Sequence, residues 1–204
     1  MLKLYDYWRS SAAYRVRIGL NLKGVAYESI PVNIGPGAEE QMRDPYRSLN
    51  PQMRVPALET EKGVLTQSLS ILVWLDQTYR DNPFVPADPW ESAQIRAFAL
   101  TIGCDIHPLN NTSVLTRLRL EFGANDDHVG EWYRHWIKLG FAALEHQATQ
   151  RPQTPYVFGD APSLADIVLV PQMANARRFK TDLAPFPRLT AWDEHARKHR
   201  AFIK

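Results

Sequence analysis

A proline-rich stretch over residues 81–88 divides this sequence into two parts whose hydrophobic patterns differ. Pro83 and Pro86 interrupt the stretch, and such punctuation is typical of a linker. Before it, strand-like alternation and helix-like spacing follow one another, whereas after it the apolar spacing is helical throughout. The sequence therefore predicts a first domain over residues 1–80 and a second, all-helical domain over residues 89–204.

The first domain shows the signals of a small mixed sheet covered by helices. In chain order, we expect a strand over 2–7, a helix capped by Ser10 or Ser11, a strand over 27–32, a short polar helix over 38–49, a hairpin over 55–58 and 63–66, and a helix capped by Ser68. This order of elements resembles a thioredoxin-like domain. The predicted fold class is thus an α/β domain followed by an all-α helical bundle.

Apolar residues three and four apart carry the helical prediction for the second domain. One stripe runs from Ile95 to Ile102, and another begins at Trp132. A further helix is opened by the run from Ser163 to Asp166, in which serine and aspartate occupy the two ends of a capping box.

Composition and charge exclude several classes of function. The single cysteine, Cys104, cannot by itself form an internal disulfide, a CxxC redox pair or a structural zinc site. A net charge of +2 is too small to indicate nucleic-acid binding, although the excess lies in residues 1–80, with ten Lys/Arg against eight Asp/Glu. No segment approaches the roughly 18–20 apolar residues of a membrane span. No signal-peptide pattern follows Met1, so we expect a cytoplasmic protein.

Pro56 follows Val55 at the start of the predicted hairpin. A proline there loses a ladder hydrogen bond and belongs at an edge or in a turn. In the trans form, which most X–Pro bonds adopt, it would be an ordinary edge residue. In the cis form it would turn the Val55 backbone groups toward a cleft, where they can pair with an extended peptide. The thioredoxin-like context favours the cis form.

Two predicted helix N-termini offer sites for anions. Ser68 presents a hydroxyl, free N–H groups and the positive end of a helix dipole, which suit a carboxylate, and Gln67 can bond an amino or amide group. Ser10 could donate to a bound thiolate, because the first domain has no cysteine of its own for disulfide exchange. Taken alone, each serine is also explained by plain helix capping.

Together these three features fit one ligand. Glutathione has a thiol that would lie beside Ser10, an extended backbone that would lie beside Val55, and an α-carboxylate that would lie at Ser68. These groups follow one another along the molecule in that order. We therefore expect glutathione as the cofactor, bound by the first domain.

Longer runs of the sequence resemble the zeta-class glutathione transferases. The N-terminal signature of the class is similar to the run SSAAYRVRIGL from Ser10 to Leu20. Further matching runs lie over residues 49–52, 55–58, 67–68, 103–111, 158–160, 164–166, 169–172 and 176–179. The resemblance covers nearly the whole chain and implies a two-domain enzyme, usually dimeric, that binds glutathione at its first domain.

The resemblance also implies roles for individual residues. Ser10, with its neighbour Ser11, would be the catalytic partner of the thiolate, and Arg9 and Arg178 would hold substrate carboxylates. The residues that would line the thiol end are Ser11, Ala12, Ala13, Tyr14 and Arg15. Those that would hold the peptide are Gln41, Gln52, Val55, Gln67 and Ser68. Those that would complete the cleft from the helical domain are His107, Asn111, Thr112 and Ser113.

The chain departs from the class pattern at two places. Ala12 stands where the class commonly has Cys, or Thr in some bacterial members, which should increase the dependence on Ser10. After Asn111, members that act on maleylpyruvate can carry two arginines, whereas this chain has Thr112 and Ser113. The second departure resembles the members that act on maleylacetoacetate.

The resemblance thus implies glutathione-dependent cis–trans isomerisation of maleylacetoacetate to fumarylacetoacetate, in tyrosine and phenylalanine breakdown. Isomerisation of maleylpyruvate, or transferase action on small α-halo acids, would use the same cofactor. A non-catalytic, transferase-like interaction module is an alternative of another class, against which the full set of glutathione-contact matches stands. The expected partners are a small dicarboxylate-type substrate and a second copy of the chain, with no nucleic acid and no membrane.

Six histidines invite a metal-site hypothesis. His195 and His199 are four residues apart on a predicted helix, as in a zinc pair, but no third ligand accompanies them. We expect both on the solvated surface, and no metal site is predicted. Cys104 has apolar neighbours in the sequence and is expected to be a packed thiol rather than a nucleophile.

Overall fold

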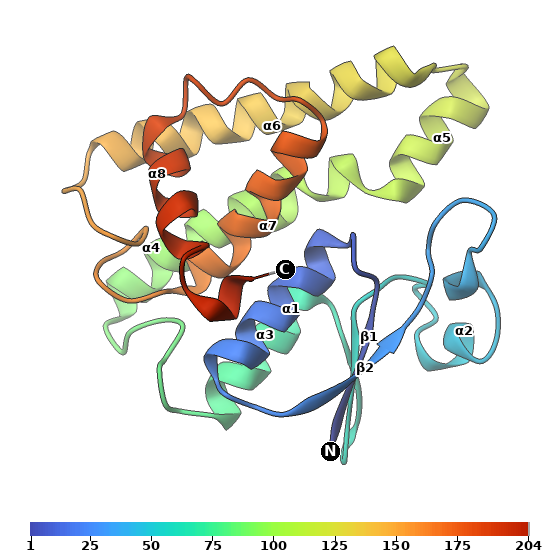
Figure 1. Ribbon diagram of the computed structural model, residues 1–204, viewed down its shortest axis with the longest axis horizontal. Helices are drawn as coiled ribbons and strands as arrows, with labels where there is room; N and C mark the ends of the chain where they lie inside the picture. Colours follow the sequence, from blue (N-terminus) through green and yellow to red (C-terminus); the bar gives the residue numbers. More distant parts are fainter. Residues whose placement is uncertain (204) are drawn as a thin grey trace. The chain divides into compact units, whose positions relative to one another are not determined.

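The computed structural model describes residues 1–203, and the chain separates into two compact units (Figure 1). One unit contains Met1–Pro83 together with residues 201–203, and the other contains Phe84–Arg200. The division falls within the stretch expected to be a linker. The helical unit, however, ends before the C-terminus, to which the expected helical domain extended.

The first unit is built on a four-stranded sheet in the order β2-β1-β3-β4. Its strands are β1 (Leu2–Asp6), β2 (Tyr27–Pro31), β3 (Ala57–Thr60) and β4 (Gly63–Thr66). Strand β1 is parallel to β2 and antiparallel to β3, and β3 and β4 form the expected antiparallel hairpin. The predicted thioredoxin-like element order is confirmed.

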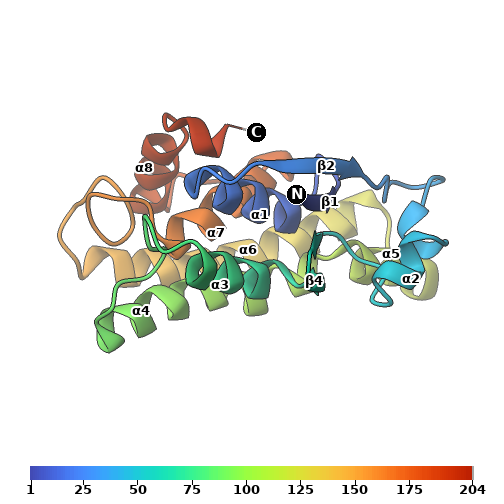
Figure 2. The same cartoon turned by 90° about the horizontal axis from the view of Figure 1, so that it is seen from below.

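Helices α1 (Ser11–Leu22) and α3 (Ser68–Thr78) pack side by side in this unit (Figures 1 and 2). Val16 of α1, Leu72 of α3 and Leu58 of β3 are all fully buried. Burying an aliphatic side chain of this size stabilises a fold by about 1.5–3 kcal/mol. This apolar core supports the N-termini of the two helices, where the candidate site lies.

The prediction of one continuous helix over residues 38–49 is wrong. The structure has a 3-10 turn, η1 (Glu40–Met42), and a separate short helix, α2 (Tyr46–Leu49). Pro45 lies between them, after a cis Asp44–Pro45 bond. Proline has no N–H to donate and disfavours helical geometry in the residue before it, so one helix cannot run through this position.

The second unit is helical throughout, as predicted. Its elements are α4 (Pro89–Leu100), the π-helical segment η2 (Thr101–Ile106), η3 (Pro108–Asn110), α5 (Thr112–Phe122), α6 (Asp126–Thr149), α7 (Leu164–Arg178) and α8 (Pro187–Ala196). Helix α7 is buried along most of its length and packs against α4 and α8. Over residues 1–203, none of the helices combines the length and apolarity needed to span a bilayer.

The start of α7 is the predicted capping box. The Ser163 side chain accepts a hydrogen bond from the helix, and the Asp166 carboxylate accepts from the Ser163 N–H at 2.9 Å and the Ser163 hydroxyl at 2.8 Å. Asp166 also accepts from the Val157 N–H at 3.0 Å, although it is only 1% exposed. Burial is the largest influence on this carboxyl and raises its pKa to about 6, against the lowering effect of these bonds.

The last turn, η4 (Arg200–Phe202), carries the chain back to the first unit. The Tyr14 hydroxyl donates to the carbonyl of Phe202, and the Asn21 side chain donates to the carbonyl of Ala201 at 3.3 Å. Phe202 is 1% exposed. These contacts explain why the C-terminal residues leave the helical unit, which no local sequence signal indicates.

Cys104 and His195 both differ from what was expected of them, whereas His199 is exposed as expected. Cys104 is exposed, so the prediction of a packed thiol is wrong, because the π-helical segment turns this side chain outward while Ile102 and Ile106 face the core. His195 is half-buried, with its ring edge-on to Tyr156 at 4.9 Å between centroids. Residues 1–203 contain no cluster of three or more His, Cys, Asp and Glu suited to a metal ion.

The raised pKa of Asp166 predicts a pH-dependent stability. Its pKa is about 6 in the fold against 3.8 for the ordinary side chain, so between these values the folded state holds a proton that the unfolded chain has lost. The free energy of unfolding should therefore fall by about 2 kcal/mol as pH rises from 4.5 to 6.5. Well above pH 6 this carboxyl should change the free energy of unfolding no further. Urea unfolding at several pH values and one fixed protein concentration measures this slope.

The Asp166→Asn variant is the control, because its amide does not titrate. The free energy of unfolding of the native protein minus that of the variant should shrink as pH rises from 4.5 to 6.5. A difference that is constant, or that grows, would mean that the three hydrogen bonds outweigh burial and keep the carboxylate ionised.

Candidate active site

Strand register places three chain segments at one edge of the sheet. Tyr5 of β1 pairs with Ala57 of β3, and Ala57 pairs with Thr66 of β4. The segment that follows β1, the segment that precedes β3 and the segment that follows β4 therefore start from the same edge. These segments contain Ser10, the Val55–Pro56 pair and the Gln67–Ser68 pair.

Ser10 is the N-cap of α1, as predicted. Its backbone is extended, with φ −72° and ψ 119°, and its hydroxyl oxygen accepts from the Ala13 N–H at 3.2 Å. The Ser10 N–H donates to the Tyr7 carbonyl at 2.8 Å, which fixes the turn out of β1. Within the part of the chain that the structure describes, the Ser10 hydroxyl donates to no other group. Its proton is available to a ligand at the helix N-terminus.

The residues after Ser10 that were expected to line a thiol are mostly buried. Ser11 is 7% exposed, Ala12 9%, and Arg15 only 1%. A terminal nitrogen of Arg15 lies 3.4 Å from the Ser68 hydroxyl, so this side chain joins the start of α1 to the start of α3. Ala13 and Tyr14 are likewise buried in the core of the unit.

The bond between Val55 and Pro56 is cis, which confirms the expectation. Both residues are buried, and β3 begins only at Ala57. Among the described residues, no hydrogen bond uses the N–H or the carbonyl of Val55. These two groups are therefore available to pair with an extended backbone from outside the sheet.

The loop before Val55 is held by a residue whose role the sequence did not indicate. Asn50 is 1% exposed, donates from its amide to the Arg54 carbonyl at 2.7 Å, and accepts from the Gln52 N–H at 3.1 Å. The Tyr46 hydroxyl also donates to the Arg54 carbonyl, at 2.6 Å, and burial raises the pKa of Tyr46 to about 12. These bonds set the position from which Val55 is presented.

The side chains of Gln52 and Gln67 meet in the structure. The Gln67 amide donates to the Gln52 side-chain oxygen at 2.9 Å. Gln67 has φ 67°, an uncommon value for a residue with a side chain, and such strain is concentrated at functional sites.

The prediction that Ser68 caps α3 is wrong by one residue. Gln67 is the N-cap and makes no capping bond with its side chain, while Ser68 is the first helical residue and is 6% exposed. The first N–H groups of α3 therefore have no capping side chain. They remain open to an anion, for which helix N-termini are well suited.

The charge around these helix N-termini favours an anionic ligand. Neither α1 nor α3 has an acidic residue in its first turn, so no carboxylate competes for the positive ends of the two dipoles. Arg9 is exposed beside Ser10, with its guanidinium 5.5 Å from the centre of the Trp8 ring. Gln41 lies apart on η1, and its side-chain oxygen is buried without a hydrogen-bond partner in the described chain.

The remaining predicted residues belong to the helical unit. Asn111 caps α5, and its side-chain oxygen accepts from the Ser113 N–H and from the Ser113 hydroxyl, each at 3.1 Å. Thr112 and Ser113 are exposed on the first turn of α5, and His107 is half-buried at the start of η3. Arg178 ends α7, is exposed, and lies 4.9 Å from the centre of the Phe179 ring.

Family models match both units of the chain. Residues 4–83 match the N-terminal domain of glutathione S-transferases, and residues 130–192 match their C-terminal domain, which together is well over half of the chain. The chain belongs to the glutathione S-transferase family. The thioredoxin-like sheet followed by a helical unit is the architecture of that family.

Individual relatives agree over nearly the full length. Maleylpyruvate isomerase of Ralstonia sp. is 46% identical, over 94% of this chain and 90% of the relative, and maleylacetoacetate isomerase of Pseudomonas aeruginosa is 43% identical, over 98% and 93%. Among solved structures, the holo form of a zeta-class bacterial maleylpyruvate isomerase has a TM-score of 0.95 at 45% identity, covering 98% of this chain and 94% of its own. Maleylacetoacetate isomerase of Methylobacterium extorquens AM1, solved with malonate and glutathione, has a TM-score of 0.93 at 36% identity, covering 98% and 94%.

The first unit of this glutathione S-transferase family member fits the parts of glutathione. The unpaired Val55 backbone is suited to a peptide, the uncapped start of α3 to a carboxylate, and the Ser10 hydroxyl to a thiolate. The paired amides of Gln52 and Gln67 add neutral donors and acceptors. Sequence reasoning named these residues but missed Asn50 and Tyr46, which act only through the loop they hold.

The Asn50 bonds predict a loss of stability on substitution. Asn50→Ala removes two hydrogen bonds in a buried place and should lower the free energy of unfolding by about 2 kcal/mol. Asn50→Asp keeps the acceptor but buries a carboxylate whose second oxygen faces the Arg54 carbonyl, so at neutral pH it should destabilise at least as much as Asn50→Ala. Ser48→Ala is the matched control, because this exposed hydroxyl bonds only within its own turn. Urea unfolding compares the three variants, and equal stability of Asn50→Ala and Ser48→Ala would contradict the assigned role.

Proposed function

We propose that this chain is a glutathione-dependent isomerase that converts maleylacetoacetate to fumarylacetoacetate, in tyrosine and phenylalanine breakdown. The observation that carries the proposal is the Ser10 hydroxyl, which caps α1 with its oxygen and keeps its proton for a ligand. The family and the relatives' names support it, since both isomerases are more than 40% identical to this chain.

Glutathione, when bound, supplies a thiolate that adds to the cis double bond and leaves again after rotation about the resulting single bond. The protein's part is to hold and polarise the reacting groups. Ser10 donates a hydrogen bond to the sulfur, and the α1 dipole favours its negative charge; together these lower the pKa of the thiol. Val55 pairs with the peptide backbone, and the α3 N-terminus holds a carboxylate.

Two arginines are proposed to hold the substrate. Arg9 and Arg178 are both exposed, and neither forms an ion pair within residues 1–203. A guanidinium binds a carboxylate in bidentate fashion, so each is suited to one acidic end of the substrate and to charge that develops in the reaction. We propose that Ser11, Gln41 and the helical-unit residues His107, Asn111, Thr112 and Ser113 also contact the bound molecules.

Maleylpyruvate is the second candidate substrate. The Ralstonia relative named for that activity is 46% identical to this chain. Thr112 and Ser113, in place of two arginines, favour maleylacetoacetate. Parallel ultraviolet assays with maleylacetoacetate, maleylpyruvate and a small α-halo acid, each with and without glutathione, separate these activities. A chain that binds no glutathione in calorimetry would instead be a non-catalytic interaction module.

We further propose a cytoplasmic homodimer. The support is the similarity to the family and to its isomerase members over nearly the whole chain. Sedimentation equilibrium of the purified protein measures the oligomeric state, and a single species near the monomer mass of 23.4 kDa would refute the dimer.

Ser10→Ala should lower kcat by about a hundredfold, a typical size for the loss of a positioned donor. The variant also loses an N-cap, which costs about 1 kcal/mol of stability, so its folding is checked by circular dichroism. Ser29→Ala, an exposed hydroxyl on β2, is the control and should keep full turnover. Turnover of Ser10→Ala within twofold of the native enzyme would remove Ser10 from the reaction.

Arg178→Ala should mainly raise the KM for the maleyl substrate, by at least about tenfold, because one charge-assisted contact is worth roughly 1.5–3 kcal/mol. Arg178→Lys keeps the charge but not the bidentate geometry, and should lie between. Lys138→Ala, an exposed cation on α6, is the control. Steady-state kinetics with saturating glutathione give KM, and a normal KM for Arg178→Ala would mean that this arginine is only a surface charge.

A further inference from the structure

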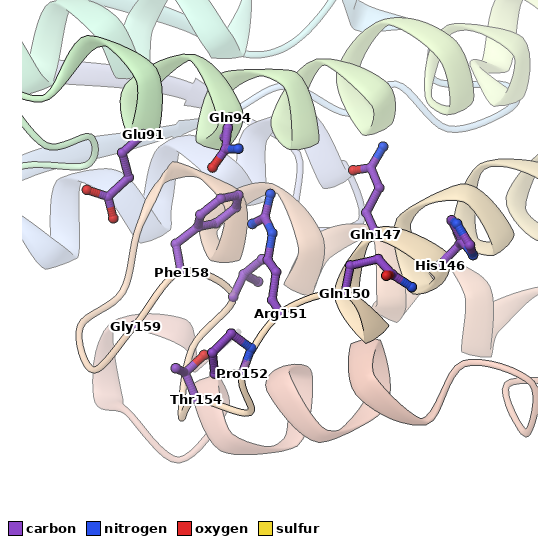
Figure 3. A pocket seen from close by; sticks show the side chains of 11 residues that line it. Glu91, Gln94, His146, Gln147, Gln150, Arg151, Pro152, Thr154, Phe158 and Gly159 are labelled. Atoms are coloured by element: carbon purple, nitrogen blue, oxygen red, sulfur yellow. The ribbon is translucent and has the colours of Figure 1, made fainter.

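The helical unit contains a pocket of about 680 Å³ that the proposed reaction does not use (Figure 3). It lies between the first turns of α4, the end of α6 and the loop over residues 151–159. Its volume is within the range of roughly 300–1,000 Å³ found for small-molecule sites.

Helix α6 separates this pocket from the candidate site residues of the same unit. In the N-terminal half of α6, the Tyr133 carbonyl accepts a hydrogen bond from the side chain of Asn110, the neighbour of the candidate residue Asn111. Gln147, near its C-terminal end, lines the pocket. At about 1.5 Å per residue, the stretch from Tyr133 to Gln147 spans about 20 Å, so the two places are distinct.

Arg151 supplies a positive charge to the pocket. Its guanidinium lies 4.0 Å from the centre of the Phe158 ring and the residue is half-buried. Over residues 1–203 it forms no ion pair, and its guanidinium donates no hydrogen bond. Burial lowers the pKa of Arg151, but a guanidinium stays charged in proteins. A partly desolvated cation without a counter-ion is suited to bind an anion.

The rest of the wall offers amide donors and an apolar surface. Figure 3 shows Gln94 of α4 pointing toward Arg151 and Phe158, with Gln147 and Gln150 on the α6 side. Val157 also lines the pocket but is only 2% exposed, so Phe158 supplies the apolar surface. Phe158 in turn packs edge-on against the buried Phe98, at 6.2 Å between ring centres, which fixes its ring plane.

The loop that carries this wall is held in place without a ligand. The Val157 N–H donates to Asp166 at 3.0 Å, and the Arg188 side chain donates to the Arg151 carbonyl at 3.0 Å. Tyr156 and Gly159 close the turn through a bridge, with the Tyr156 N–H donating to the Gly159 carbonyl at 2.9 Å. The pocket is therefore preorganised, which reduces the entropic cost of binding.

We propose that this pocket binds a small monocarboxylic acid with a flat apolar body. The carboxylate lies on Arg151 and accepts from the Gln94 amide, while the body packs against Phe158. Glu91 stands at the rim with an exposed carboxylate, which disfavours ligands that carry a second negative charge.

Benzoate is the probe, titrated into the full-length protein with glutathione in excess to occupy the first unit. Backbone amide NMR shifts should move for residues 150–159 and give a dissociation constant. Arg151→Gln should weaken benzoate binding at least about tenfold, as expected for a charge-assisted bond. Arg117→Gln is the control, because Arg117 is exposed on α5 and pairs with Glu121 at 2.7 Å. Isomerase turnover should be unchanged in both variants.

Two further ligands test the stated chemistry. Benzyl alcohol lacks the charge and inorganic phosphate lacks the apolar body, so each should bind at least about tenfold more weakly than benzoate. If Arg151→Gln does not fold, Gln94→Ala takes its place, with a loss of about threefold expected. Shifts absent from residues 150–159, an unchanged constant in Arg151→Gln, or phosphate binding as tight as benzoate would each overturn the proposal.

Discussion

Backbone hydrogen bonds hold Ala57 between Tyr5 and Thr66, and the candidate site depends on this register. A slip of one residue would turn every side chain of β3 to the opposite face of the sheet, and would move the cis Val55–Pro56 bond away from the end of β1. The hydrophobic core enforces the register, because Leu58 is fully buried only in this alignment. The site is thus a consequence of packing, and the residues that hold it need not touch a ligand.

Asp166 plays a comparable part in the helical unit. It accepts from the Ser163 N–H and hydroxyl, which begins α7, and from the Val157 N–H, which fixes the loop over residues 151–159. A single buried carboxyl therefore links the central helix to the pocket wall that carries Arg151. Because these bonds converge on one desolvated group, the helix start and the pocket should loosen together when the carboxyl is removed.

Sequence reasoning succeeded where a feature depends on neighbours along the chain. The Ser10 cap and the capping box at Ser163 are local patterns of this kind, and alternation over a few residues was enough for the hairpin. It failed where distant contacts decide. The Tyr14 hydrogen bond to Phe202 joins opposite ends of the chain. The N-cap of α3 lies at Gln67, directly after β4, and not at Ser68. No sequence pattern indicates that Asn50 holds its loop in place.

The low exposure of residues 11 and 12 shows what the chain loses by having alanine at position 12. Ser11 and Ala12 are 7% and 9% exposed, whereas Ser10 is half-exposed at the helix start. A cysteine or threonine at position 12 would therefore lie in a largely buried place. The absence of a second polar side chain there removes a possible accessory to the reaction but leaves the helix N-terminus and the Ser10 proton unaltered. Of the two serine hydroxyls at the start of α1, the one that caps the helix, Ser10, is therefore the more accessible to a ligand.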